Sequence, residues 1–184
     1  MNLRILKENE IGRGILIENS SDTFVKKVLN ENKSSDYLIN GIYMQGDKEN
    51  RNGRIYPFYD VLLPETQRYI KEVVDIGRAG MELEHPNELE LNPERTVGRI
   101  KKLWADGTNI MGESILINYG LGILVREMID AGFRMGVSSR GVGTVGKNKL
   151  VESDFTIHHI DIVFSPSGID CWIDKAVNES AETI

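Results

Sequence analysis

The chain has 184 residues, which on the usual size of a protein domain allows one domain and hardly two. It carries 22 Lys and Arg against 28 Asp and Glu, a formal charge of −6, and this balance argues against a nucleic-acid partner, whose phosphates call for a basic surface. Hydrophobic residues make up 40% and charged residues 27%, the composition of a folded globular protein rather than of a disordered chain.

The single cysteine, Cys171, excludes an internal disulfide, so we expect a cytosolic protein. No run approaches the roughly 20 apolar residues that a membrane helix requires, and the first residues lack the apolar core of a signal peptide. We therefore expect no membrane partner. Residues 175–184 have little to bury and are predicted to form a flexible C-terminal tail.

The first half of the chain predicts a strand followed by a helix. Residues 37–45 are rich in β-branched and aromatic side chains, which is typical of a strand. Apolar residues recur with helical spacing over residues 59–74, with Pro64 near the first turns and Gly77 where the helix should end.

The second half predicts more strands than helices. Residues 96–104 and 109–117 flank an Asp-Gly step and predict a hairpin. A second helix is predicted from Leu121 to Ile129, with Gly132 as its C-cap. The pattern of residues 133–139 and 150–164 predicts extended strands, with glycine-rich residues 140–146 as the turn between them. The sum predicts an α+β fold with a curved, barrel-like antiparallel sheet surrounded by helices.

Two motifs suggest a cofactor or a metal and fail on their context. Residues 141–147 match the spacing of nucleotide-binding glycine loops, but a strand pattern follows where those loops require a helix. Glu82, Glu84 and His85 offer zinc ligands without the spacing of known zinc motifs. We expect neither group, and we interpret the acidic run 82–90 as a solvated loop.

Three other groups of residues could carry acid–base or nucleophilic chemistry. His85 precedes Pro86 at the end of an alternating segment, where a stiff neighbour would fix the imidazole as a general base requires. Ser138 and Ser139 precede a glycine-rich stretch whose amides could face an oxyanion; they are equally consistent with ordinary turn hydroxyls.

The last predicted strand supplies a third polar group. Alternation places His159 and Asp161 on one largely apolar face, where each must find a partner or water. Either could orient and charge-balance the base imidazole, as the third member of a serine triad does. The alternative is a polar pair at the end of the strand that faces solvent.

Several separated blocks, in order along residues 37–173, resemble the prohead core protein proteases of T-even-like bacteriophages. They are residues 50–57 (NRNGRIYP), 82–86 (ELEHP), 103–107 (LWADG), 136–141 (GVSSRG) and 161–167 (DIVFSPS). The resemblance implies a single protease domain over residues 1–174 with a fold like that of herpesvirus assemblins. It further implies a serine endopeptidase that digests scaffold, core and capsid proteins inside the assembling procapsid, in the host cytoplasm.

The resemblance also assigns roles to residues. It makes His85 the base and Ser138 the nucleophile, with Ser139 as the fallback. Asp161 becomes the third member ahead of His159, and Arg140 supports the oxyanion. It implies no cofactor and no metal.

Proteases of this kind cut after Leu or Ile, any residue, then Glu. Such triplets occur in the N-terminal third of this chain, at residues 6–8, 16–18 and 29–31, so self-processing is a hypothesis. The alternative function is a catalytically silent protease-like protein that binds capsid-core proteins during assembly. The sequence leaves open whether the chain forms a homo-oligomer.

Overall fold

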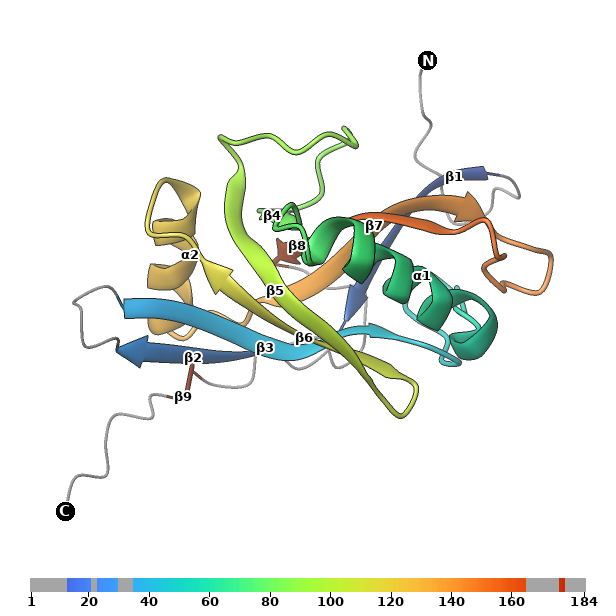
Figure 1. Cartoon of the computed structure of the whole chain (residues 1–184), viewed down its shortest axis with the longest axis horizontal. Coiled ribbons are helices and arrows are strands. Elements are labelled where there is room, and N and C mark those ends of the chain that lie inside the picture. The colour runs from blue at the N-terminus through green and yellow to red at the C-terminus, as the bar shows by residue number, and fades with distance from the viewer. Residues whose placement is uncertain (1–12, 21–22, 30–34, 165–175, 178–184) are drawn as a thin grey trace.

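The computed structural model describes residues 13–20, 23–29, 35–164 and 176–177, with side chains between residues 37 and 164. Their elements form two mainly antiparallel sheets and two helical regions (Figure 1). Cys171, the predicted cleavage triplet at 6–8 and the Ser-Pro-Ser block at 165–167 lie outside the described residues.

The larger sheet has six strands in the order β4-β5-β6-β3-β2-β9. These are β2 (Thr23–Leu29), β3 (Ser35–Gln45), β4 (Gly80–Glu82), β5 (Thr96–Asp106), β6 (Asn109–Leu116) and β9 (Ala176–Val177). The strand predicted at residues 37–45 is confirmed as β3, and the predicted hairpin is confirmed as β5 and β6. Its turn is tight, since Asp106 pairs with Asn109 and Gly107 has a φ of 58°. Strand β9 pairs in parallel with β2, and the flexible C-terminal tail expected at residues 175–184 stays a prediction.

The smaller sheet has the order β1-β7-β8. Its strands are β1 (Arg13–Ser20), β7 (Gly136–Thr144) and β8 (Thr156–Val163). Strand β7 continues through residues 140–144, so the prediction of a glycine turn directly after Ser139 is wrong. The reason is packing, because a Cβ on Gly141 would lie 2.4 Å from the carbonyl oxygen of Thr156. Glycine at this position serves close approach of β7 to β8 rather than a turn.

The two sheets meet where β4 runs beside β8. Leu83 forms a parallel bridge with Ile162, and the amide of Glu84 donates a hydrogen bond of 2.7 Å to the carbonyl of Ile162. This contact brings the residue after β4 next to the strand that carries Asp161. The strand pairing gives two sheets, and closure into a barrel stays a prediction.

The helix predicted at residues 59–74 is confirmed as one continuous helical region. Its central part is α1 (Leu63–Tyr69), and its two ends, η1 (Phe58–Leu62) and η2 (Ile70–Val74), are wound as π-helix. The wide first turn precedes Pro64, which lacks an amide hydrogen and would crowd the preceding turn of a regular helix. Gly77, with a φ of 76°, turns the chain away after the helix ends.

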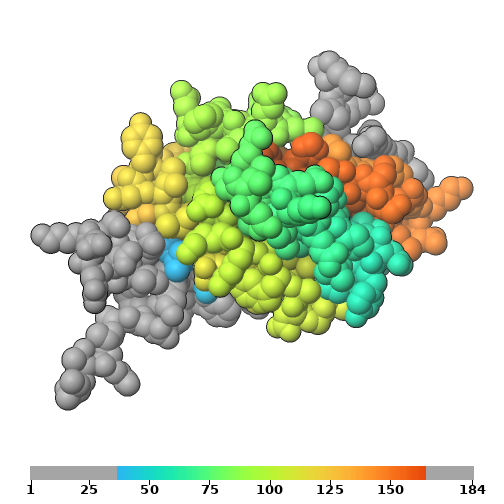
Figure 2. Space-filling view, viewed as in Figure 1, coloured from blue at the N-terminus to red at the C-terminus, as the bar shows by residue number. Residues whose placement is uncertain are grey.

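Helix α1 and its flanks pack against β8. The carboxylate of Glu65 accepts a 2.6 Å hydrogen bond from the amide of Ile157, and Arg68 donates to the carbonyl of the same residue at 3.1 Å. On the face shown in Figure 2, this helical region (teal) lies between the yellow-green β5–β6 hairpin and the orange atoms of the β7–β8 region. The helix therefore holds the start of the strand that leads to Asp161.

The second helix, α2 (Leu121–Asp130), confirms the other predicted helix, and Gly132 follows it with a φ of 90°. It buries Val125 and Ile129, while Leu124 is 45% exposed. Within the described residues, no helix is both long and apolar enough to span a bilayer. The fully buried apolar side chains from both sheets include Tyr37, Ile39, Tyr43, Met81, Val97, Ile100, Ile110, Leu116, Val137 and Ile160.

Candidate active site

Three residues that are far apart in the sequence meet at the junction of the two sheets. His85 follows β4, Ser138 lies in β7, and Asp161 lies opposite Ser138 in β8. Asp161 Oδ2 is 3.1 Å from His85 Nδ1, and Ser138 Oγ is hydrogen-bonded to His85 Nε2. The structure thus brings together the predicted base, the predicted nucleophile and the first-ranked third residue.

The local chain path explains how the imidazole reaches this position. Glu84 adopts a φ of 61°, a left-handed conformation that is uncommon outside glycine. Its amide and its carboxylate both bond to the end of β8, at Ile162 and at the amide of Phe164. These hydrogen bonds hold a strained turn, which places His85 over the sheet, and such turns are frequent at functional sites.

The hydrogen bonds fix which ring nitrogen of His85 carries the proton. An ionised carboxylate accepts hydrogen bonds and cannot donate them, so the nitrogen facing Asp161 is the protonated Nδ1. This leaves the lone pair of Nε2 to accept a hydrogen bond from the hydroxyl of Ser138. That tautomer is the one in which an imidazole can take a proton from a serine.

The alternative residues lie elsewhere. Strand alternation puts Ser139 on the opposite face of β7 from Ser138, away from His85. His159 lies on the same face of β8 as Asp161. Its ring does not bond to His85, however, because its Nε2 donates a hydrogen bond of 2.7 Å to the carbonyl of Leu89. His158 lies on the other face of β8. Burial lowers the pKa of its imidazole, and the neighbouring His159 lowers it further.

Arg140 lies two residues after Ser138 and is fully buried. Its Nε is 2.9 Å from Asp161 Oδ2, and one of its terminal nitrogens forms an ion pair with Glu82. The other donates to the carbonyl of Glu88 and, at 3.4 Å, to that of Pro86. The guanidinium is therefore committed to carboxylates and carbonyls, which leaves the predicted oxyanion support to the backbone amide and keeps it a prediction.

Glu82 is a residue whose place sequence reasoning missed. It was expected in a solvated acidic loop, and this expectation is wrong, because its side chain is fully buried. Its Oε2 pairs with Arg140, its Oε1 accepts a 2.8 Å hydrogen bond from the amide of Asn92, and its own amide donates to Asp161 Oδ1 at 3.1 Å. The available signal was its position in the alternating segment of residues 81–85, which ends at His85.

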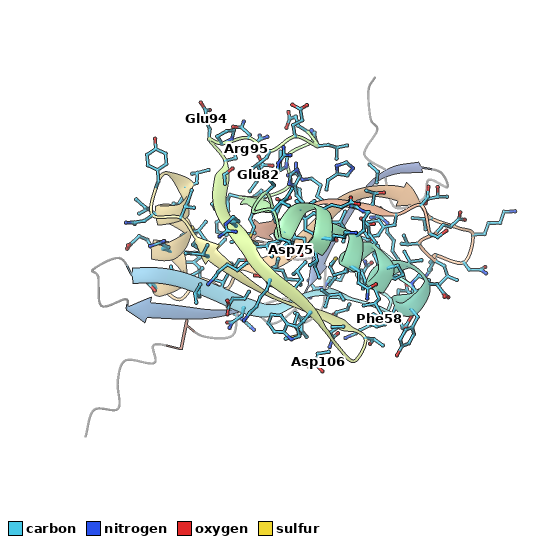
Figure 3. All side chains as sticks on the ribbon, viewed as in Figure 1. Phe58, Asp75, Glu82, Glu94, Arg95 and Asp106 are labelled. Atoms are coloured by element: carbon cyan, nitrogen blue, oxygen red, sulfur yellow. The ribbon has the colours of Figure 1, made fainter. Side chains whose placement is uncertain are left out.

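The residues from 83 to 95, here called the His85 segment, cover the junction of the sheets. Side chains from below hold it by its backbone: Glu82 at Asn92, His159 at Leu89 and Arg140 at Glu88. Figure 3 shows Glu82 and Arg95 near one another at the base of this segment, and their side chains are 3.7 Å apart. The segment is therefore anchored to the site at several points.

Tyr69 completes the buried surroundings from the helical side. Burial raises the pKa of its hydroxyl, and the negative charge of Asp161 raises it further. The tyrosine is consequently neutral beside the ion pairs. In the part of the chain that the structure describes, no group of three or more His, Cys, Asp or Glu side chains is arranged to hold a metal ion.

Comparisons with known proteins agree with this geometry. The family model of the prohead core protein serine proteases matches residues 10–182. The chain belongs to this family. It is 33% identical over 150 residues to the prohead core protein protease of Enterobacteria phage T4, covering 77% of this chain and 70% of that protein. The solved structure of the bacteriophage T4 capsid assembly protease is similar with a TM-score of 0.78 and 27% identity, covering 84% of this chain and 99% of that one.

Membership in the family confirms the predicted resemblance and establishes the broad function. The protein is a bacteriophage protease of prohead maturation. The similar structure also confirms the mixed α and β fold with antiparallel sheets.

Removing the cation of the site should destabilise this prohead protease. Arg140→Met keeps most of the side-chain volume but leaves Glu82 and Asp161 buried without their positive partner. We expect the free energy of unfolding to fall by about 3–5 kcal/mol in urea titrations near neutral pH. Arg99→Met, which removes an exposed arginine from β5, should change it by no more than about 0.5 kcal/mol. Equal stability of the two variants would contradict the buried ion cluster.

Proposed function

We propose that this prohead protease is a serine endopeptidase with Ser138 as nucleophile, His85 as general base and Asp161 as the residue that orients the base. The observation that carries the proposal is the continuous hydrogen-bonded chain from Asp161 through His85 to Ser138. Each member comes from a different segment, and the order of carboxylate, imidazole and hydroxyl is the one that an activated serine nucleophile requires.

The geometry supports the following reaction. His85 Nε2 takes the hydroxyl proton of Ser138 as the serine oxygen attacks the peptide carbonyl, and the same nitrogen returns the proton to the leaving amine. Water then repeats the sequence to release the acyl group. Asp161 balances the imidazolium that forms in both steps, and the amide of Arg140 is our candidate for stabilising the oxyanion.

The proposal extends to substrate and place. We infer that the enzyme cleaves after Leu or Ile, any residue, then Glu. Its substrates would be scaffold, core and capsid proteins inside the procapsid, in the host cytoplasm. We also infer an assemblin-like barrel as the underlying fold. The alternative, a silent assembly protein, is favoured by one observation: Ser138 is fully buried. Substrate cleavage by the purified protein separates the two.

Replacing the nucleophile should abolish cleavage. Ser138→Ala and His85→Ala should each lower kcat/KM by about 10⁴-fold or more, measured with a peptide containing a Leu-x-Glu site. Ser139→Ala, the matched change one residue along, should retain activity because its hydroxyl lies on the other face of β7. Thermal melting of each variant controls for loss of fold. An inactive Ser139→Ala beside an active Ser138→Ala would move the nucleophile by one position.

The third member can be separated from its neighbour on the same face. Asp161→Asn removes the acceptor that holds His85 in the productive tautomer, and kcat should fall by about 10⁴-fold. His159→Gln keeps a donor for the carbonyl of Leu89, so activity should stay within about tenfold of wild type. The opposite ranking in single-turnover assays would make His159 the orienting residue.

Self-processing is supported by the position of β1. It pairs with β7 in antiparallel register, with Glu18 opposite Ser139 and Asn19 opposite Ser138. The predicted triplet at residues 16–18 ends at Glu18, so the bond from Glu18 to Asn19 lies along the nucleophile's own strand. Because β1 pairs along β7, it occupies the place where an extended substrate peptide could add to β7 as a strand.

Cleavage at this bond should remove the first 18 residues. We expect intact-mass spectrometry of concentrated wild-type protein to show a fragment beginning at Asn19, and we expect Ser138→Ala to stay whole. Glu18→Ala should block this product, whereas Glu8→Ala should leave it unchanged. A wild-type chain that keeps its N-terminus while it cleaves a peptide substrate would contradict self-processing at this site alone.

A further inference from the structure

Glu82 is placed where it can influence the site without touching a substrate. Its side chain is fully buried, and both of its carboxylate oxygens have partners, Arg140 on one and the amide of Asn92 on the other. Buried carboxylates are costly unless they are paired and hydrogen-bonded, and these contacts meet that requirement.

Two connections lead from Glu82 to the proposed catalytic residues. Through Arg140, whose Nε is 2.9 Å from Asp161 Oδ2, the carboxylate of Glu82 fixes the guanidinium that limits the orientations of Asp161. Through Asn92, it anchors the far end of the His85 segment. The carboxylate therefore restrains both the residue that orients the imidazole and the segment that carries it.

The charges of the cluster also bear on the imidazole. Glu82 and Asp161 are anions and Arg140 is a cation, so these three buried groups sum to one negative charge while His85 is neutral. Arg95 also lies 3.7 Å from Glu82, but its side chain is 37% exposed, so solvent screens its positive charge. The imidazole of His85 contacts Asp161 from β8 and Ser138 from β7. Behind Asp161 lie Arg140 from β7, Glu82 from β4 and the neutral Tyr69 from the helical side. His159 from β8 bonds to the segment that carries His85, at the carbonyl of Leu89. A net negative charge in a buried site favours the imidazolium that forms during catalysis.

We propose that Glu82 is a positioning residue of the serine protease site: acting through Arg140 and Asn92, it holds Asp161 and the His85 segment in place and supplies the negative charge that balances the imidazolium. This inference rests on the proposed catalytic function. It assigns to the first glutamate of the Glu-Leu-Glu-His sequence a role in catalysis that requires no contact with the substrate.

The test compares three glutamate variants of the whole chain, assayed on a Leu-x-Glu peptide across pH. Glu82→Gln is nearly isosteric but can satisfy only one of its two donors and loses the charge. We expect kcat to fall about tenfold or more with KM nearly unchanged. Cleavage falls at low pH because imidazolium cannot accept the serine proton, and this acid limb should move to lower pH by about half a unit or more, since removing an anion disfavours imidazolium.

The other two variants isolate the cause. Glu82→Asp keeps the charge but is one methylene too short to reach both partners, so kcat should fall while the acid limb stays in place. Glu90→Gln removes an exposed carboxylate from the same segment and should match wild type in both measurements. Thermal melting accompanies each assay, so that a loss of activity is compared with a loss of fold.

Each outcome of these assays either supports or overturns the positioning role of Glu82. Wild-type kcat and an unmoved acid limb in Glu82→Gln would overturn the positioning role, and so would a lowered melting temperature without either kinetic change. Failure of both Glu82 variants to fold would make the residue purely structural. Ser138→Ala in the same assay separates the two levels: if it still cleaves, the proposed catalytic function has failed, and if it is inactive while Glu82→Gln is normal, only this inference has.

Discussion

The fold around the site depends on satisfying one buried cation. Arg140 has no exposed surface, and a guanidinium is charged at any pH at which a protein is folded. Its partners must come to it, and they come from two other strands: Glu82 from β4 and Asp161 from β8. The ion cluster thus ties together the edge of the six-stranded sheet and two strands of the three-stranded sheet, and the relative position of His85 and Ser138 follows from this junction.

The same cluster gives the site its electrostatic character. The carboxylate of Asp161 receives the amide of Glu82, the guanidinium of Arg140 and the ring of His85. A carboxylate held by several donors has little freedom to rotate, so the imidazole that bonds to it is held as well. Preorganised dipoles and charges of this kind need not reorganise as charge develops on the ring, which is how enzymes obtain much of their electrostatic stabilisation.

Local patterns in the sequence were enough for most elements and for the chemical types of the site. Helical periodicity identified both helices, and β propensity identified β3 and the β5–β6 hairpin, because these elements bury one face against the core. The glycines of β7 misled the prediction, since glycine can serve a turn or a close approach and only the neighbouring strand decides which. Periodicity likewise put His159 and Asp161 on one face and could not rank them, because the partners that distinguish them, Leu89 and His85, are about 70 residues away in sequence.

Glu82 was missed for a related reason. An acidic residue in an acidic run is usually solvated, and the cation that buries this one lies 58 residues further along the chain. Stability alone does not explain such a cluster, because replacing buried ion pairs by apolar residues of similar size is often neutral or stabilising. A well-packed leucine or methionine trio at the junction of β4, β7 and β8 would hold the sheets together, but it would offer Asp161 no fixed orientation and His85 no opposing charge. On our proposal, the function of the cluster is to orient the imidazole of His85. Burial of the charged groups costs desolvation energy, and it also excludes the water that would let them adopt other arrangements.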